Sequence, residues 1–137
     1  MRACLRGTIF AVLVLALTSI AHTQTSQSLQ SRIPKPDPKK YQAVRDAKDW
    51  KNPILIVLRD GIEIRGVTPL GQGIPVESVA GALERLPNSA WPYGLVVIVQ
   101  ENGVRARGDS PSIEANRKKL LTLLTNLGIT PELWPSA

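Results

Sequence analysis

The chain has 137 residues and a formal net charge of +6, with 17 lysines and arginines against 11 aspartates and glutamates. It contains one cysteine and one histidine. These counts exclude a disulfide framework and a zinc site built from the usual cysteine and histidine ligands. We therefore expect no metal and no cofactor.

Residues 1–21 have the parts of an export signal. Arg2 and Arg6 give a positive start, residues 9–17 form an unbroken apolar run, and Ala21 ends a stretch of small residues suited to signal peptidase. An uncleaved membrane anchor is the alternative, but the apolar run is shorter than the ~20 residues that span a membrane. We predict a signal peptide over 1–21 and a protein that is periplasmic or secreted.

Cleavage would also change the chemistry that the chain can perform. It would remove the only cysteine, Cys4, and would leave the only histidine, His22, at the new N-terminus. A histidine-assisted serine or cysteine nucleophile is thereby excluded, and we predict that the protein is not an enzyme and has no catalytic residue.

Once residues 1–21 are removed, the excess of positive charge lies in residues 22–48, whereas residues 49–137 contain equal numbers of acidic and basic residues. A high isoelectric point that belongs to a tail gives little support for nucleic-acid binding, and we expect none. Residues 33–40 space three prolines among lysines, which favours an extended stretch. We predict a basic, proline-containing stalk over 22–48 that brings the domain near a membrane, with a short helix over 41–50.

The domain of residues 49–137 begins with a predicted β-hairpin. Residues 54–58 (ILIVL) form a continuous apolar run typical of a strand buried on both faces, and Asp60-Gly61 is a strong turn signal. Residues 62–65 alternate apolar and polar side chains, so we expect a half-exposed strand with Glu63 pointing outward. A loop over 67–74 follows.

The second half of the domain alternates helices and strands. An apolar stripe predicts a helix over 76–86, and residues 95–99 (LVVIV) predict a buried strand. Residues 104–107 fit an edge strand or an irregular loop equally well. Ser110 as N-cap begins a second helix whose inward face carries Ile113, Leu120, Leu124 and Leu127.

A last strand over 129–134 contains Pro131, which favours the edge of a sheet. The order β-β-α-β-α-β predicts an α+β fold of two layers, with a mixed sheet and both helices on one face.

Side chains that could carry chemistry have structural explanations. Asp60 precedes a turn glycine, and Asp109 precedes a helix start. Together with Glu63 and Glu101 they leave open a small secreted hydrolase that uses carboxylates, as an alternative function. The Gly71-Gln72-Gly73 loop lacks the rest of a phosphate-binding motif, and the Arg107-Gly108-Asp109 tripeptide is too short to indicate adhesion.

The candidate binding residues are Trp91, Tyr93, Arg105 and Arg107. Trp91 and Tyr93 lie in one helix-to-strand connection, and such side chains either anchor a partner or fill the open end of a layered fold. Arg105 and Arg107 would share one face of an edge strand, where charges also prevent unwanted pairing. We expect Trp91 at the Asp60-Gly61 end of the sheet and the other two tryptophans at the opposite end, in two separate aromatic contacts.

The segments ILIVLRDGIEIRG, IPVESVAGALERL, GLVVIVQ and LLTNLGI, in this order over about residues 53–134, resemble the periplasmic domain of the ExbD/TolR biopolymer-transport family. The resemblance implies a hairpin, helix, strand, helix and final strand. It carries over no functional residue, because residues 9–21 contain no acidic residue and Glu101 matches the family's aspartate only loosely.

These observations favour a non-catalytic envelope module that binds a partner protein or a cell-wall polymer. A homodimer through a strand edge stays open.

Overall fold

The computed structural model describes residues 28–101 and 110–135. The export signal, the candidate strand over 104–107 with Arg105 and Arg107, and Asp109 all lie outside these residues. The elements are α1 (Leu29–Arg32), α2 (Pro38–Tyr41), β1 (Ile54–Leu58), β2 (Gly61–Ile64), α3 (Val76–Glu84), a 3-10 turn (Asn88–Ala90), β3 (Val96–Glu101), α4 (Ser110–Asn126) and β4 (Thr130–Leu133).

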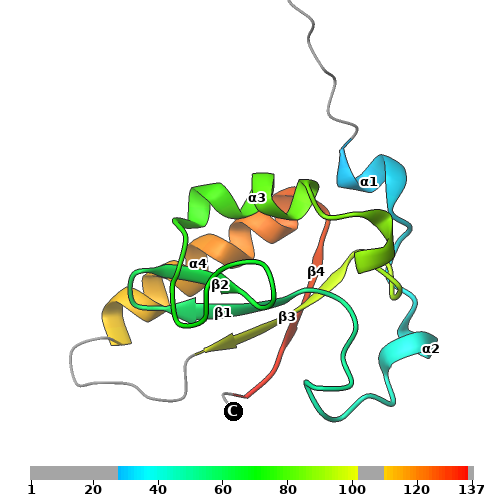
Figure 1. Cartoon of the computed structure of the whole chain (residues 1–137), viewed down its shortest axis with the longest axis horizontal. Coiled ribbons are helices and arrows are strands. Elements are labelled where there is room, and N and C mark those ends of the chain that lie inside the picture. Colours follow the sequence, from blue (N-terminus) through cyan, green and yellow to red (C-terminus); the bar gives the residue numbers. More distant parts are fainter. Residues whose placement is uncertain (1–27, 102–109, 136–137) are drawn as a thin grey trace, which may run out of the picture.

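The sheet has the strand order β2-β1-β3-β4. Strand β1 pairs antiparallel with β2 and parallel with β3, and β4 runs parallel to β3 at the edge. Helices α3 and α4 lie together on one side of the sheet (Figure 1). The predicted mixed sheet with two helices on one face is confirmed, and Pro131 does lie in an edge strand.

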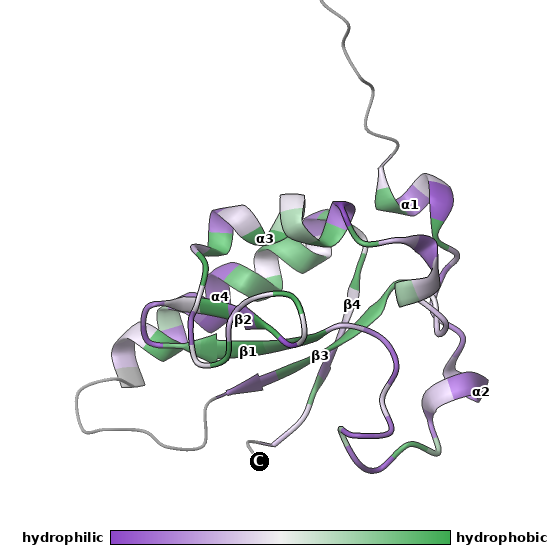
Figure 2. Cartoon of the chain, in the orientation of Figure 1, coloured by the Kyte–Doolittle hydropathy of each residue, from purple (hydrophilic) through white to green (hydrophobic). Residues whose placement is uncertain are grey.

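The face of the sheet that the helices cover, here called the helix face, holds an aliphatic core. Alternate residues of the strands meet the inward sides of both helices, and β1 and the first part of β3 are coloured as strongly hydrophobic (Figure 2). The predicted inward residues Ile113, Leu120 and Leu124 are buried, and Leu127 is partly buried. In α3 the buried residues are Val76, Val79, Ala82 and Leu83.

The segment before the domain is docked on it, so the stalk prediction does not hold for residues 28–48. Leu29 and Ile33 are 2% and 3% exposed and belong to the helix-face core. Arg32 donates to the carbonyl oxygens of Glu84 and Leu86, where α3 ends and a positive charge is favoured.

We call residues 33–50 the strap, because they cross from the helix face to the opposite face of the sheet. The backbone N–H of Leu95 donates to the carbonyl of Pro34 (2.9 Å), and that of Asp37 donates to the carbonyl of Tyr93 (3.0 Å). Beyond α2 the strap continues in turns, so the helix expected over 41–50 is wrong. Residues 34–37 of the proline-containing stretch therefore form a segment that is hydrogen-bonded to the domain.

The opposite face, here called the strap face, is covered mainly by aromatic side chains of the strap. Tyr41 and Trp50 pack on Ile54 and Ile98 of the sheet, together with Tyr93 and Val96. The sheet face opposite the helices is thus mostly closed by the segment that sequence patterns assign to a stalk.

Strand β2 is also closed on the strap face, by the loop of residues 66–74. Glu63 does point to the side away from the helices, as alternation predicts, but it is buried. Its Oε2 accepts the backbone N–H of Gly71 (2.9 Å), and Ile62 and Ile74 form a bridge at the base of the loop. We expected a half-exposed strand over 62–65, but all residues of β2 are buried.

The turn of the hairpin is displaced by one residue from the expected position. Leu58 pairs with Gly61, so Arg59 and Asp60 form the connection.

Within the described residues, no helix has the length and apolar character needed to cross a membrane.

Candidate functional site

A groove on the strap face is the candidate site. It has a volume of about 360 Å³ and lies between the strap and the edge strand β4. We call it the aromatic groove, and its lining residues are Pro38, Tyr41, Gln42, Val44, Arg45, Trp50, Glu132 and Trp134.

Strand alternation explains why β4 supplies two of these side chains. Glu132 pairs with Ile98, whose side chain is on the strap face, and Trp134 lies two residues further on the same side. Leu133 pairs with Val99 of the helix-face core and points the other way, with 62% of its surface exposed. The edge strand therefore presents a carboxylate and an indole to the groove.

Four of the six aromatic residues in the chain meet at this groove. The ring centroids of Trp50 and Trp134 are 5.7 Å apart, those of Trp50 and Tyr93 are 5.0 Å apart, and those of Trp50 and Tyr41 are 5.4 Å apart. All three pairs have edge-to-face geometry, which is the favoured arrangement for aromatic rings. Trp50 is the centre of the cluster.

Several polar groups of the groove are available to a ligand. Neither the hydroxyl of Tyr41 nor the indole N–H of Trp134 makes a hydrogen bond within the described residues, and neither is fully buried. Glu132 forms no salt bridge within the same residues. The guanidinium of Arg45, by contrast, donates to the carbonyl oxygens of Gln42 and Val44.

The electrostatic environment of the groove is visible in the pKa of Tyr41. Burial raises this pKa above its ordinary value of 10.0, and the negative charges of Glu132 and Asp37 raise it further. A neutral hydroxyl close to the carboxylates of Glu132 and Asp37 is an environment that favours a cation.

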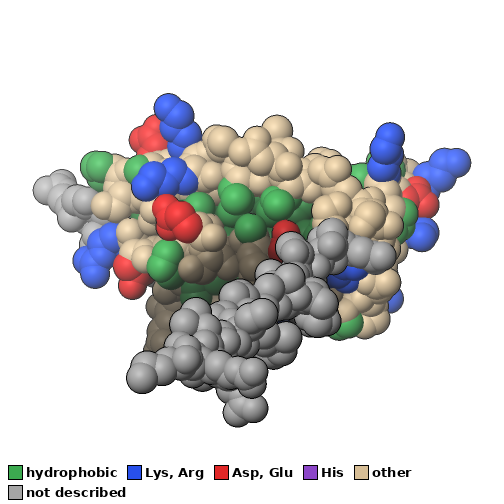
Figure 3. Space-filling view, turned by 90° about the horizontal axis from the view of Figure 1, so that it is seen from above, with side chains coloured by type: hydrophobic (Ala, Val, Ile, Leu, Met, Phe, Trp, Pro, Cys, Tyr) green, Lys and Arg blue, Asp and Glu red, His purple; other side chains and the backbone are tan. Residues whose placement is uncertain are grey.

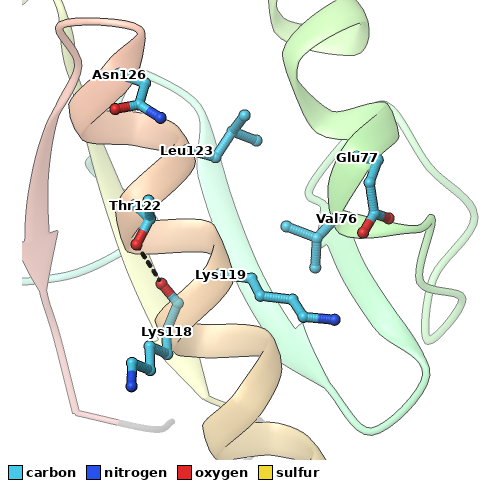
Figure 4. Close-up of a pocket in the computed structure, with 7 residues that line it drawn as sticks. All are labelled: Val76, Glu77, Lys118, Lys119, Thr122, Leu123 and Asn126. Atoms are coloured by element: carbon cyan, nitrogen blue, oxygen red, sulfur yellow. Dashed lines mark hydrogen bonds between the residues drawn. The ribbon is translucent and has the colours of Figure 1, made fainter.

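A second groove, of about 400 Å³, separates the start of α3 from α4 (Figure 4). Val76 and Leu123 face each other across it, and Lys118, Lys119 and Glu77 stand on its sides (Figure 4). The hydroxyl of Thr122 is already bonded to the carbonyl of Lys118 (3.1 Å). Charged side chains of both signs therefore line this groove beside its apolar walls.

The surface seen from above has its charges apart from its apolar area. In the view of Figure 3, most charged side chains gather toward the two ends of the described part, and the middle is largely apolar or uncharged.

A third groove lies between β4 and α4, where Arg117 forms a salt bridge with Glu101 at 3.1 Å.

The sequence-predicted binding residues Trp91 and Tyr93 are separated by the sheet. Trp91 is buried in the helix-face core, and Tyr93 is buried in the aromatic cluster of the strap face. The backbone N–H of Tyr93 donates to the side chain of Asn52, just before β1, so this connection lies at the opposite end of the sheet from Asp60-Gly61. The expected position of Trp91 is therefore wrong, whereas Trp50 and Trp134 do contact each other.

Two of the acidic residues considered for a hydrolase, Glu63 and Glu101, lie on opposite faces of the sheet. Glu63 lies on the strap face beneath the loop of residues 66–74, whereas Glu101 pairs with Val57 and lies on the helix face with Arg117. Two carboxylates on opposite faces of a sheet cannot act on one bond. The described residues contain no group of three or more histidine, cysteine or acidic side chains arranged to hold a metal ion.

Sequence reasoning missed the aromatic groove because its residues come from two segments that are far apart in the chain, the strap and the end of β4. The available signal is the position of the aromatic residues: Trp50 and Tyr93 come shortly before predicted buried strands, and Trp134 ends the last one. No protein-family model, curated protein or solved structure matches the chain.

Proposed function

We propose that the protein is an exported, non-catalytic envelope module that binds a partner protein or a cell-wall polymer through the aromatic groove. The observation that carries the proposal is the meeting of Tyr41, Trp50 and Trp134 beside the unpaired carboxylate of Glu132. Tryptophan and tyrosine are the side chains that most often dominate binding energy at interfaces, since they bury a large area with few rotatable bonds.

The groove has the composition of a recognition site more than that of a catalytic one. Its polar groups are a carboxylate, a phenol, an amide and an arginine whose guanidinium is held by backbone carbonyls. A second carboxylate or a general base within reach of Glu132 is missing from the lining residues, so acid and base roles have no pair to occupy.

The location of the module is part of the same proposal and depends on residues 1–21. Their sequence supports export, with an N-terminal membrane anchor as the alternative. The likeness to the periplasmic domain of the ExbD/TolR family stays a hypothesis from sequence pattern, and a gene beside transport-motor components would strengthen it.

Crosslinking pulldown from envelope extracts tests the binding function. We expect the full-length chain to capture a defined protein or wall fragment. The Trp134→Ala variant should capture at least tenfold less of that component. Leu133→Ala is the matched control, because this neighbouring side chain points to the other face and is exposed. Equal capture by both variants, or no capture by a folded chain, would contradict the proposal.

A further inference from the structure

We infer that the aromatic groove receives an extended, proline-containing peptide segment that carries a basic residue. This inference rests on the proposed binding function and names the chemistry of the partner at the same site. Three observations support it: the shape of the aromatic surface, the unpaired hydrogen-bond donors, and the unpaired carboxylate of Glu132.

The aromatic side chains of the groove present ring edges, whereas a sugar would need a broad, flat platform. Tyr41 and Trp50 are only 8% and 6% exposed, and their rings stand at 73° to each other. Trp134 stands at 62° to Trp50 and is the more exposed wall. These rings touch one another edge to face, so a ligand packs on their outer edges and on the more exposed Trp134. A proline ring is small enough for such a surface, and aromatic-lined grooves are the usual receptors for polyproline helices.

The donors of the groove match the acceptors of such a peptide. A polyproline helix makes no internal hydrogen bonds, so its carbonyl oxygens are unpaired. The hydroxyl of Tyr41 and the indole N–H of Trp134 have no acceptor within the described residues and are accessible. Each can donate to a peptide carbonyl without breaking an existing bond.

The carboxylate of Glu132 selects a basic residue in the peptide. Glu132 has no salt-bridge partner in the described residues, whereas the opposite charge in the groove, on Arg45, is held by the carbonyl oxygens of Gln42 and Val44. An arginine of the peptide would pair with this carboxylate, and the pair would be partly shielded from water.

The strap itself shows that this region of the domain accepts an extended proline-containing chain. Its residues 34–37 are held by backbone hydrogen bonds to Tyr93 and Leu95 and lead directly into Pro38 of the groove. A bound peptide would lie beside a segment of similar conformation.

Fluorescence anisotropy with defined probes tests the inference on the full-length chain. The main probe is a labelled ten-residue polyproline with one central arginine. We expect it to bind at least tenfold more tightly than a glycine-serine peptide with the same arginine, and severalfold more tightly than polyproline without arginine. A hexamer of N-acetylglucosamine serves as the polysaccharide competitor and should not displace it.

Variants of the groove assign the contacts. Trp134→Ala should weaken binding of the main probe at least tenfold, and Trp134→Phe, which keeps a ring but loses the N–H, should weaken it less. Glu132→Gln should abolish the preference for the arginine-containing probe, whereas the same change in the other groove, Glu77→Gln, should leave it unchanged. If Trp134→Ala fails to fold, Glu132→Gln decides, because its side chain is partly exposed.

The inference is overturned if polyproline binds no better than the glycine-serine peptide, if Glu132→Gln keeps the arginine preference, or if the sugar hexamer displaces the probe. If the peptide assay gives such a result but the pulldown still captures an envelope component, the binding function is retained and only the peptide partner is rejected. Loss of both, with the fold intact, would reject the binding function itself.

Discussion

The two faces of the sheet are built by different means. The helix face is packed by aliphatic side chains of α3 and α4 that follow helical periodicity. The strap face is packed by aromatic side chains from a segment with little regular structure, held by a few backbone hydrogen bonds. The comparison suggests that the helix face sets global stability, whereas the strap face can loosen locally and still leave the sheet intact.

The strongest test of this difference is Leu124→Ala on the helix face. Leu124 is fully buried in α4, and removing its side chain leaves a cavity that should cost about 3 kcal/mol of unfolding free energy. Urea denaturation should show a lower midpoint with an unchanged slope. Leu133→Ala, an exposed leucine on the same side of the sheet, should change stability by less than about 0.5 kcal/mol.

Gly94→Ala should act on the strap instead. Gly94 has φ of +83°, and a Cβ atom there would lie 2.4 Å from the carbonyl oxygen of Lys35. We expect a loss on the order of 2 kcal/mol, with faster trypsin cleavage after Lys39 and Lys40, neither of which precedes a proline. Gly66→Ala is the control, because Gly66 has φ of +78° but no atom within 4 Å of the added carbon. Equal cleavage rates in both variants would show that the strap is not held at this point.

Glu63→Ala tests the other part of the cover on the strap face. The backbone N–H of Gly71 would lose its acceptor, which should cost about 1 to 2 kcal/mol. Hydrogen exchange should accelerate at Gly71 much more than at Leu95, where the strap is bonded. Glu63→Gln keeps an acceptor oxygen and should lose less. A uniform acceleration would mean that the loop of residues 66–74 and the strap unfold together.

The smallest expected effect is a pH dependence confined to the strap face. Because the folded pKa of Tyr41 is raised, the folded chain keeps this proton at pH values where the unfolded chain has lost it. Stability should therefore fall as the pH rises above about 10. Tyrosinate absorbance should show Tyr41 titrating at a lower pH in Glu132→Gln, and Tyr41→Phe should remove that transition. An unchanged titration would argue against the influence of Glu132.

The parts predicted from sequence are those in which one periodicity dominates. The apolar runs of β1 and β3, the inward residues of α4 and the edge position of Pro131 all follow from local pattern. These patterns are fixed by burial against the same core, so a single segment carries enough information.

The parts that could not be predicted depend on contacts between distant segments. Leu29 and Ile33 are isolated apolar residues in a polar stretch, and only their four-residue spacing hints at a buried helical turn. The aromatic groove needs the strap and the end of β4 at once. Alternation placed Glu63 on the correct face but could not reveal the loop that covers it.

One buried side-chain amide, that of Asn52, links the segment before β1 to the start of β3. The side chain of Asn52 donates to the carbonyl oxygens of Gly94 and Val96 (2.7 and 2.8 Å) and accepts the N–H of Tyr93 (2.9 Å). Spontaneous deamidation of asparagine proceeds through a ring that the next backbone nitrogen closes, and here that nitrogen belongs to Pro53, which has no hydrogen to lose. The amide that joins the first strand to the third is therefore protected against chemical ageing by its own neighbour.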